Sequence, residues 1–185
     1  MNSNKMKFNF NPFPILKSER LVLQKLDLTH SAALFSYQSN KLNFPYVDMT
    51  VYKVVEEAQN YISKMNDGVE NNKWIIWAVC LKETYEIIGT LSIWNIDESH
   101  NKGEFGYGIF PEFRRKGYMK EAISCALNYA FENMKLDKVE AYTSHANKDS
   151  IAFLKAIEFE FIETIEDEYS GGALMDVFII KNDKE

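Results

Sequence analysis

The sequence is short of the features that define several large classes of protein. Two cysteines, Cys80 and Cys125, occur among its 185 residues, each in an apolar run without a nearby Cys or His partner. This spacing excludes a disulfide framework and predicts free thiols in a reducing compartment. No apolar run approaches the roughly 18 residues of a membrane span, and the N-terminus lacks the apolar core and cleavage site of a signal peptide. We therefore expect a cytoplasmic protein without a membrane partner.

Positive charge is also scarce, because 27 acidic residues outweigh 21 basic ones and leave a formal net charge of −6. Binding to a nucleic-acid backbone needs a basic face, so nucleic acid is not an expected partner. The three histidines have no metal-ligand spacing, and we expect no metal. Apolar residues, in contrast, make up 46% of the chain, which is enough for one core. The expected organisation is a flexible, Asn-rich arm over residues 1–14 and a single domain over residues 15–185.

The hydrophobic periodicity changes several times along the chain. Alternating β-rich runs predict strands, and apolar residues at helical spacing predict helices. The predicted strands cover residues 20–26, 73–81, 86–96, 102–110 and 138–144, and the predicted helices cover residues 32–37, 50–68, 114–134 and 149–157. Two further β-rich runs bracket Ser170, Gly171 and Gly172, which predicts a C-terminal hairpin. This order of elements indicates one α+β domain.

One short segment concentrates positive charge where a helix is expected to begin. Arg114, Arg115, Lys116 and Lys120 surround Gly117, although the positive end of the helix dipole disfavours cations. The first four amides of a helix have no internal partner and form a site for an anion, which glycine lets approach closely. A multiply charged phosphate would make every one of these interactions favourable. A solvated basic turn is the alternative interpretation.

The segment from Gly103 to Ile162 resembles the signature region of the GCN5-related N-acetyltransferases, and within them the branch of the ribosomal-protein acetyltransferases RimJ and RimL. In that family the pattern Arg/Gln-x-x-Gly-x-Gly/Ala binds the pyrophosphate of acetyl-CoA, and it maps onto Arg114, Gly117 and Met119. The resemblance implies a mixed, mostly antiparallel central sheet of about six to seven strands flanked by about four helices.

The resemblance also implies a set of residues that contact acetyl-CoA. The later pattern Asn-x-x-Ser maps onto Asn147 and Ser150, which face the pantetheine arm and the thiol in that branch. The full set of expected cofactor-binding residues is Ile109, Phe110, Arg114, Arg115, Lys116, Gly117, Tyr118, Met119, Lys120, Asn147 and Ser150. Four positions depart from the family. Met119 replaces the last small residue of the phosphate pattern and Arg115 a frequent glycine, while Glu158 replaces a later glycine and Leu154 the tyrosine that many members use as general acid.

Acetyl transfer to an amine needs a proton acceptor for the amine and a stabilised leaving thiolate. Glu104, in the strand before the basic loop, and Glu168, near the expected hairpin, are the two candidate bases. Each is equally compatible with a solvated strand carboxylate. Ser150 is the candidate to hydrogen-bond the thiol and return a proton.

The residues and the resemblance together predict an acetyl-CoA-dependent N-acetyltransferase. The acceptor would be a primary amine, in the form of a protein N-terminus, such as that of a ribosomal protein, a polyamine or another small amine. The alternative is a non-catalytic CoA-binding or regulatory module with the same fold. A homodimer is left open, because dimers are common in the branch that the chain resembles.

Overall fold

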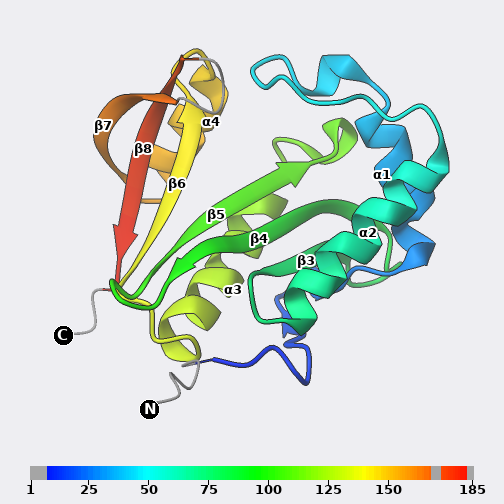
Figure 1. Ribbon diagram of the computed structural model, residues 1–185, viewed down its shortest axis with the longest axis horizontal. Helices are drawn as coiled ribbons and strands as arrows, with labels where there is room; N and C mark the ends of the chain where they lie inside the picture. The colour runs from blue at the N-terminus through cyan, green and yellow to red at the C-terminus, as the bar shows by residue number, and fades with distance from the viewer. Residues whose placement is uncertain (1–7, 168–171, 183–185) are drawn as a thin grey trace.

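The computed structural model describes residues 8–167 and 172–182. Short 3-10 turns occupy Leu28–His30, Lys41–Asn43 and Pro111–Phe113. The strands and helices, shown in Figure 1, are β1 (Leu16–Lys17), β2 (Leu21–Lys25), α1 (Ser31–Gln38), α2 (Val55–Glu70), β3 (Ile75–Leu81), β4 (Ile87–Asp97), β5 (Lys102–Ile109), α3 (Tyr118–Glu132), β6 (Lys138–Ser144), α4 (Lys148–Ala156), β7 (Glu160–Asp167) and β8 (Ala173–Lys181).

The described strands form one sheet of eight in the order β1-β2-β3-β4-β5-β6-β8-β7. Every neighbouring pair is antiparallel except β5 and β6, which are parallel and are joined through α3. The expected α+β fold is confirmed, and the sheet is slightly larger than predicted because the two-residue strand β1 adds to its edge. None of the described helices is both long enough and apolar enough to cross a membrane.

The core lies on both faces of the sheet, because α2 is in front of it and α3 behind it (Figure 1). β3 carries a continuous apolar run whose first six residues are buried, as expected for a strand covered on both sides. Trp77 of β3 packs its ring edge-on against Tyr129 of α3, with 5.7 Å between centroids. On the opposite face, Gly68 of α2 admits the ring of Trp74, which would lie 2.0 Å from any Cβ at that position.

Three predicted boundaries differ from the structure. Residues 8–14, expected within a flexible arm, are packed against the domain: Phe10 is 2% exposed, and Pro14 O accepts a 2.8 Å hydrogen bond from the indole of Trp77. The helix expected from residue 50 begins at Val55, after Glu57 has capped the preceding backbone amides. The helix expected from residue 114 begins at Tyr118, because Gly117 adopts a left-handed conformation as its N-cap.

The sheet divides between β5 and β6. Their parallel ladder runs from Lys102 opposite Lys138 to Phe105 opposite Ala141 and ends there, although β5 continues to Ile109 and β6 to Ser144. Figure 1 shows the two strands leaving a common corner and diverging toward the top of the molecule. The facing edges of both strands therefore lack a ladder partner over their C-terminal parts, and this opening is the central feature of the site described next.

Candidate active site

The loop between β5 and α3 presents a row of open backbone amides. Arg115 and Gly117 both have positive φ angles, of 59° and 79°, and the first hydrogen bond of α3 runs from Glu121 N to Gly117 O at 3.1 Å. Within the described part of the chain, the amides of residues 115–120 have no backbone acceptor. Left-handed residues at the start of a helix turn successive N–H groups into one concave surface that suits an anion. We call residues 114–120 the phosphate loop.

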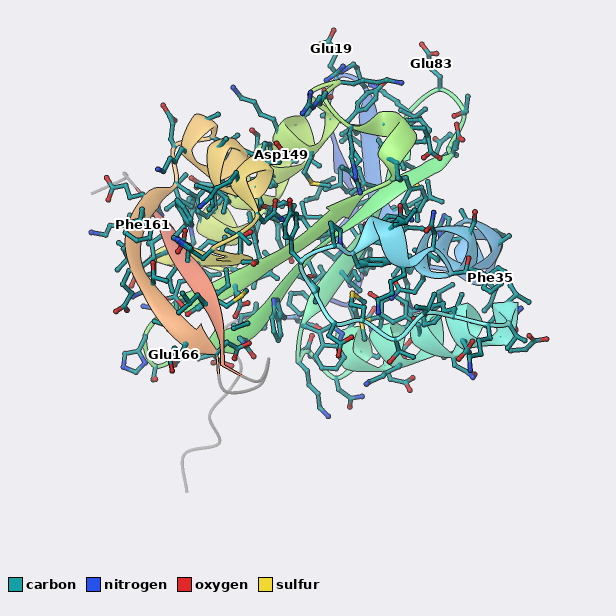
Figure 2. All side chains as sticks on the ribbon, turned by 90° about the horizontal axis from the view of Figure 1, so that it is seen from above. Glu19, Phe35, Glu83, Asp149, Phe161 and Glu166 are labelled. Atoms are coloured by element: carbon teal, nitrogen blue, oxygen red, sulfur yellow. The ribbon has the colours of Figure 1, made fainter. Side chains whose placement is uncertain are left out.

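The four predicted cations of the phosphate loop have different environments. Arg114 turns back, and its Nε donates to the carbonyl oxygen of Ile109 at 3.3 Å, so it helps to hold the loop against β5. Arg115 is 88% exposed in its side chain and lies 3.9 Å from the carboxylate of Asp149, at the start of α4 (Figure 2). Lys116 and Lys120 are also exposed. Lys116 Nζ lies over the ring of Phe113, 5.5 Å from its centroid. Three of the four cations are therefore exposed around the amides, held only by weak surface contacts.

Arg20, at the start of β2, supports the phosphate loop from outside and was not identified from the sequence. Its Nε lies 2.7 Å from Glu121 Oε2, and its Nη1 donates to the carbonyl oxygen of Lys116 at 3.0 Å. The guanidinium group also covers the ring of Tyr118, 4.5 Å from its centroid. Burial opposes ionisation of Glu121, but hydrogen bonds from Ser18 and Arg20 outweigh it and hold the pKa of Glu121 below its usual value. The carboxylate of Glu121 thus neutralises the charge of Arg20 from outside the loop, and it does not occupy the loop amides.

Met119 replaces the small residue of the family pattern without obstructing the amides. Its side chain is 6% exposed and packs in the core, so it points away from the concave surface that its own N–H joins. Phe110, at the end of β5, is similarly buried at 5% exposure. Ile109 is half-buried and supplies the carbonyl that holds Arg114. These apolar residues anchor both ends of the loop to the core.

The start of α4 brings a second set of predicted residues to the opening between β5 and β6. Asn147 is the N-cap, and its Oδ1 accepts a hydrogen bond from the amide of Ser150 at 3.1 Å. The cap fixes the first turn, while Asp149 of the same turn is exposed. Leu154, where the family tyrosine would lie, is fully buried in the core and offers no hydroxyl group.

Tyr107 is the second site residue that the sequence did not reveal. It lies on β5 beyond the last ladder pair, and its hydroxyl oxygen is 2.9 Å from Ser150 Oγ. Its ring rests against Phe153 of α4, with 5.7 Å between centroids. Burial raises the pKa of Tyr107 to about 12, so the phenol stays protonated at physiological pH.

Glu104 lies on β5 and, by strand alternation, on the face of the sheet opposite Tyr107. Asn95 Nδ2 donates to its Oε2 at 2.9 Å. Burial raises the pKa of Glu104, and although the bond from Asn95 opposes the shift, the nearby carboxylates of Glu140 and Asp167 add to it. A half-buried carboxylate with a raised pKa is a better proton acceptor than an exposed one, and such groups gather at functional sites.

Further acidic and aromatic side chains extend this face across β6. Glu140, opposite Glu104 in the ladder, has a side chain 10% exposed and pairs with Lys102 at 3.1 Å. The hydroxyl of Tyr142 donates to Glu140 Oε2 at 3.1 Å. The second candidate base, Glu168, lies outside the described residues. Within the described ranges there is no cluster of three or more His, Cys, Asp or Glu that could hold a metal ion.

Comparison with known proteins identifies the family. A family model described as an acetyltransferase (GNAT) domain matches residues 20–160. The chain belongs to the GNAT family of acetyltransferases. A relative from Bacillus licheniformis, the uncharacterised N-acetyltransferase p20, is 30% identical over 165 residues, which cover 89% of this chain and 93% of the relative. YoaA of Bacillus subtilis (strain 168), another uncharacterised N-acetyltransferase, is 28% identical over 148 residues. These residues cover 80% of this chain and 84% of YoaA.

Solved GNAT structures share the fold at lower identity. RimL, a ribosomal L7/L12 alpha-N-protein acetyltransferase in complex with coenzyme A, gives a TM-score of 0.79 at 17% identity, covering 93% of this chain and 100% of that one. The ribosomal-protein-S5-alanine acetyltransferase from Vibrio fischeri gives a TM-score of 0.76 at 19% identity. The match covers 92% of this chain and 98% of that one. At these identities the solved structures show the shared fold alone. The family model and the relatives identify this GNAT domain as an N-acetyltransferase.

Proposed function

We propose that this chain transfers the acetyl group of acetyl-CoA directly to a primary amine. In the reaction the amine nitrogen bonds to the acetyl carbon, the bond from that carbon to sulfur breaks, and the electron pair of the broken bond leaves with the sulfur. The proton that the nitrogen loses goes to a carboxylate. The observation that carries the proposal is the combination of the open amides of residues 115–120 with the opening between β5 and β6.

The phosphate loop would hold the pyrophosphate of acetyl-CoA. The amides of residues 115–120 need acceptors, and a pyrophosphate supplies several negatively charged oxygens at once. Gly117 permits the φ of 79° that aligns these amides, a conformation that residues with a Cβ rarely adopt. Arg115, Lys116 and Lys120 would then offset the ligand's charge rather than repel one another.

The acyl arm would lie between the diverging ends of β5 and β6, where the strand edges have no ladder partner. An extended amide-containing arm can use such edges as an added strand does. Asn147 would fix the first turn of α4 beside the arm, and Ser150 would donate its hydroxyl proton in a hydrogen bond to the leaving sulfur. Ser150 and Glu104 then approach the thioester from opposite faces of the sheet.

Glu104 is the base that we favour. Its raised pKa suits a group that must remove a proton from an ammonium or an attacking amine, directly or through water. Glu168, in the sequence before Ser170, Gly171 and Gly172, is the second candidate. Protein N-termini, polyamines and other small primary amines are the acceptor classes to test.

A non-catalytic CoA-binding module is the second candidate function, and the buried Leu154 in the place of a tyrosine acid is the observation that favours it. Incubation of the protein with acetyl-CoA and a panel of N-terminal peptides and polyamines separates the two. We expect amine-dependent release of free thiol, with one acetylated amine detected by mass spectrometry for each thiol formed. Tight binding of CoA without amine-dependent thiol release across the panel would instead favour the non-catalytic module.

A further inference from the structure

The hydroxyl groups of Tyr107 and Ser150 form a pair that joins the two sides of the opening. Their oxygens are 2.9 Å apart, and among the described residues neither oxygen has another hydrogen-bond partner. Tyr107 lies on β5 beyond Phe105, the last residue of the β5–β6 ladder, while Ser150 lies in the first turn of the helix that follows β6. The pair therefore sits where the strands begin to separate, which is where the reactive end of an inserted arm would come.

The pair has one hydroxyl proton that is not used inside it. Two hydroxyl groups carry two protons, and a single hydrogen bond between them engages one. A phenol is more acidic than an aliphatic alcohol and is the better donor, so Tyr107 is expected to donate and Ser150 Oγ to accept. The proton of Ser150 is then left to point into the opening. The pKa of Tyr107, raised to about 12 by burial, keeps the donor protonated throughout the working pH range.

We propose that Tyr107 is a positioning residue for the acetyl transfer: by donating to Ser150 Oγ it directs the Ser150 proton at the sulfur of the departing CoA. This inference rests on the proposed function. Leu154, at the place of the family tyrosine, offers no hydroxyl group, and the Tyr107–Ser150 pair supplies hydrogen bonding to the sulfur in its absence. Sequence position alone would not connect Tyr107 with Ser150, which lies 43 residues further along the chain.

The pair acts by hydrogen bonding and not by giving up a proton. When the bond from the acetyl carbon to sulfur breaks, sulfur keeps the electron pair, and Ser150 donates a hydrogen bond to the resulting thiolate. Tyr107 in turn strengthens that donation, since a hydroxyl that accepts one hydrogen bond becomes a better donor in the next. Both hydroxyl groups keep their protons, and the thiolate takes its own proton from water after the product is released.

A purely structural role for Tyr107 is the competing explanation. Its ring packs on Phe153 at 5.7 Å between centroids, so the residue also fastens α4 to β5. The variant Tyr107→Phe keeps this ring and removes only the hydroxyl group. A structural role would change the melting temperature or the affinity for CoA, whereas the positioning role changes the ionisation of the thiol that is bound beside Ser150.

The experiment measures the pKa of the CoA thiol in the complex of enzyme and CoA, without an acceptor. The ultraviolet absorbance of the thiolate is followed against pH, with the complex of desulfo-CoA as the blank. Ser150→Ala removes the direct donor, and Tyr107→Phe together with Ser150→Ala completes a double-mutant cycle. The matched control is Tyr129→Phe, which removes a hydroxyl from α3, where the ring packs against Trp77 away from the opening.

We expect Ser150→Ala and Tyr107→Phe each to raise the bound thiol pKa by about one unit, and the double variant to raise it no further than Ser150→Ala alone. The rate constant kcat should fall about tenfold in Tyr107→Phe, while the KM for acetyl-CoA stays at the wild-type value. Tyr129→Phe should leave the thiol pKa unchanged.

An unchanged thiol pKa in Tyr107→Phe would overturn the inference, and so would a Tyr107→Phe effect that persists undiminished when Ser150 is already alanine. Failure of the proposed function looks different. In that case CoA does not bind, or no amine is acetylated by the wild-type protein. Because the thiol titration uses CoA alone, it reports on Tyr107 even in a protein whose acceptor is still unidentified.

Discussion

The phosphate loop that follows β5 and the carboxylates nearer its start differ both in charge and in exposure. At the loop, Arg115 is 88% exposed, whereas the side chain of Glu140 on the acidic face is 10% exposed. Solvent screens the exposed cations from one another, so their mutual repulsion lowers the stability of the folded chain only slightly when no ligand is bound. Partial burial instead raises the pKa of Glu104 and prepares it to accept a proton. Under the proposed function, the loop after β5 binds the charged cofactor and Glu104 of β5 accepts a proton.

The largest effect should come from the acidic end. Glu104→Gln keeps the shape and the contact with Asn95 but cannot accept a proton, so kcat should fall by about 10²–10⁴ while the affinity for CoA stays within a few-fold of wild type. Steady-state kinetics and a CoA titration measure the two quantities. A normal rate in Glu104→Gln together with a slow Glu168→Gln would transfer the role of base to Glu168.

The pH dependence of the same reaction follows from the raised pKa of Glu104. The carboxylate that accepts the proton is lost as the pH falls through this raised pKa, at a higher pH than for an ordinary glutamate, so the wild-type rate should decline early on the acidic side. In Glu104→Gln the rate should recover as rising pH supplies neutral amine. A pH–rate profile of identical shape in both proteins would show that Glu104 does not act as the base.

At the loop, Gly117→Val should produce the next largest effect, on binding rather than on rate. A β-branched residue is strongly strained at a φ of 79°, so the loop would lose the backbone conformation that aligns its amides. We expect the Kd for CoA to rise about ten- to hundredfold. Calorimetric titration, with the melting temperature recorded alongside, separates this loss from a general loss of folding. Unchanged affinity would remove Gly117 from the binding site.

The smallest effects should distinguish the support of the loop from its charge. Arg20→Ala removes the hydrogen bond to the carbonyl oxygen of Lys116 and the ion-pair partner of Glu121. Because the loop backbone is then less firmly held, the Kd for CoA should rise about tenfold. Arg115→Ala removes an exposed, screened charge and should raise the Kd only about two- to fivefold. Equal effects in the two variants would mean that charge, and not loop geometry, governs affinity.

The same comparison explains how much the sequence could reveal. The loop was predictable because its residues are consecutive, and the strand at 138–144 because its pattern is local and complete. Asn147 and Ser150 follow a short pattern in the sequence, and the structure joins them by a hydrogen bond at the start of α4. Local patterns thus predicted the elements and the positions of the candidate residues along them.

The residues that the sequence did not reveal act over long separations. Arg20 meets Glu121 across 101 positions, and no local pattern marks either partner. In the sequence, Tyr107 has the pattern of an ordinary aromatic residue in a strand. Its hydrogen bond to Ser150 forms only when α4 packs against β5. The start of α3 was predicted too early because the cations continue into a helical pattern, whereas the left-handed Gly117 delays the helix to Tyr118. Such features depend on tertiary contacts, which periodicity does not encode.

The most direct measurement follows the backbone amides of the phosphate loop by NMR while CoA is added. If these amides hold the pyrophosphate, the largest shifts should appear at residues 115–120, whose N–H groups have no backbone acceptor in the folded chain. The amides along the paired part of β5 should move less. Binding of CoA that leaves the amides of residues 115–120 at their original positions would contradict the assignment of this loop as the cofactor site.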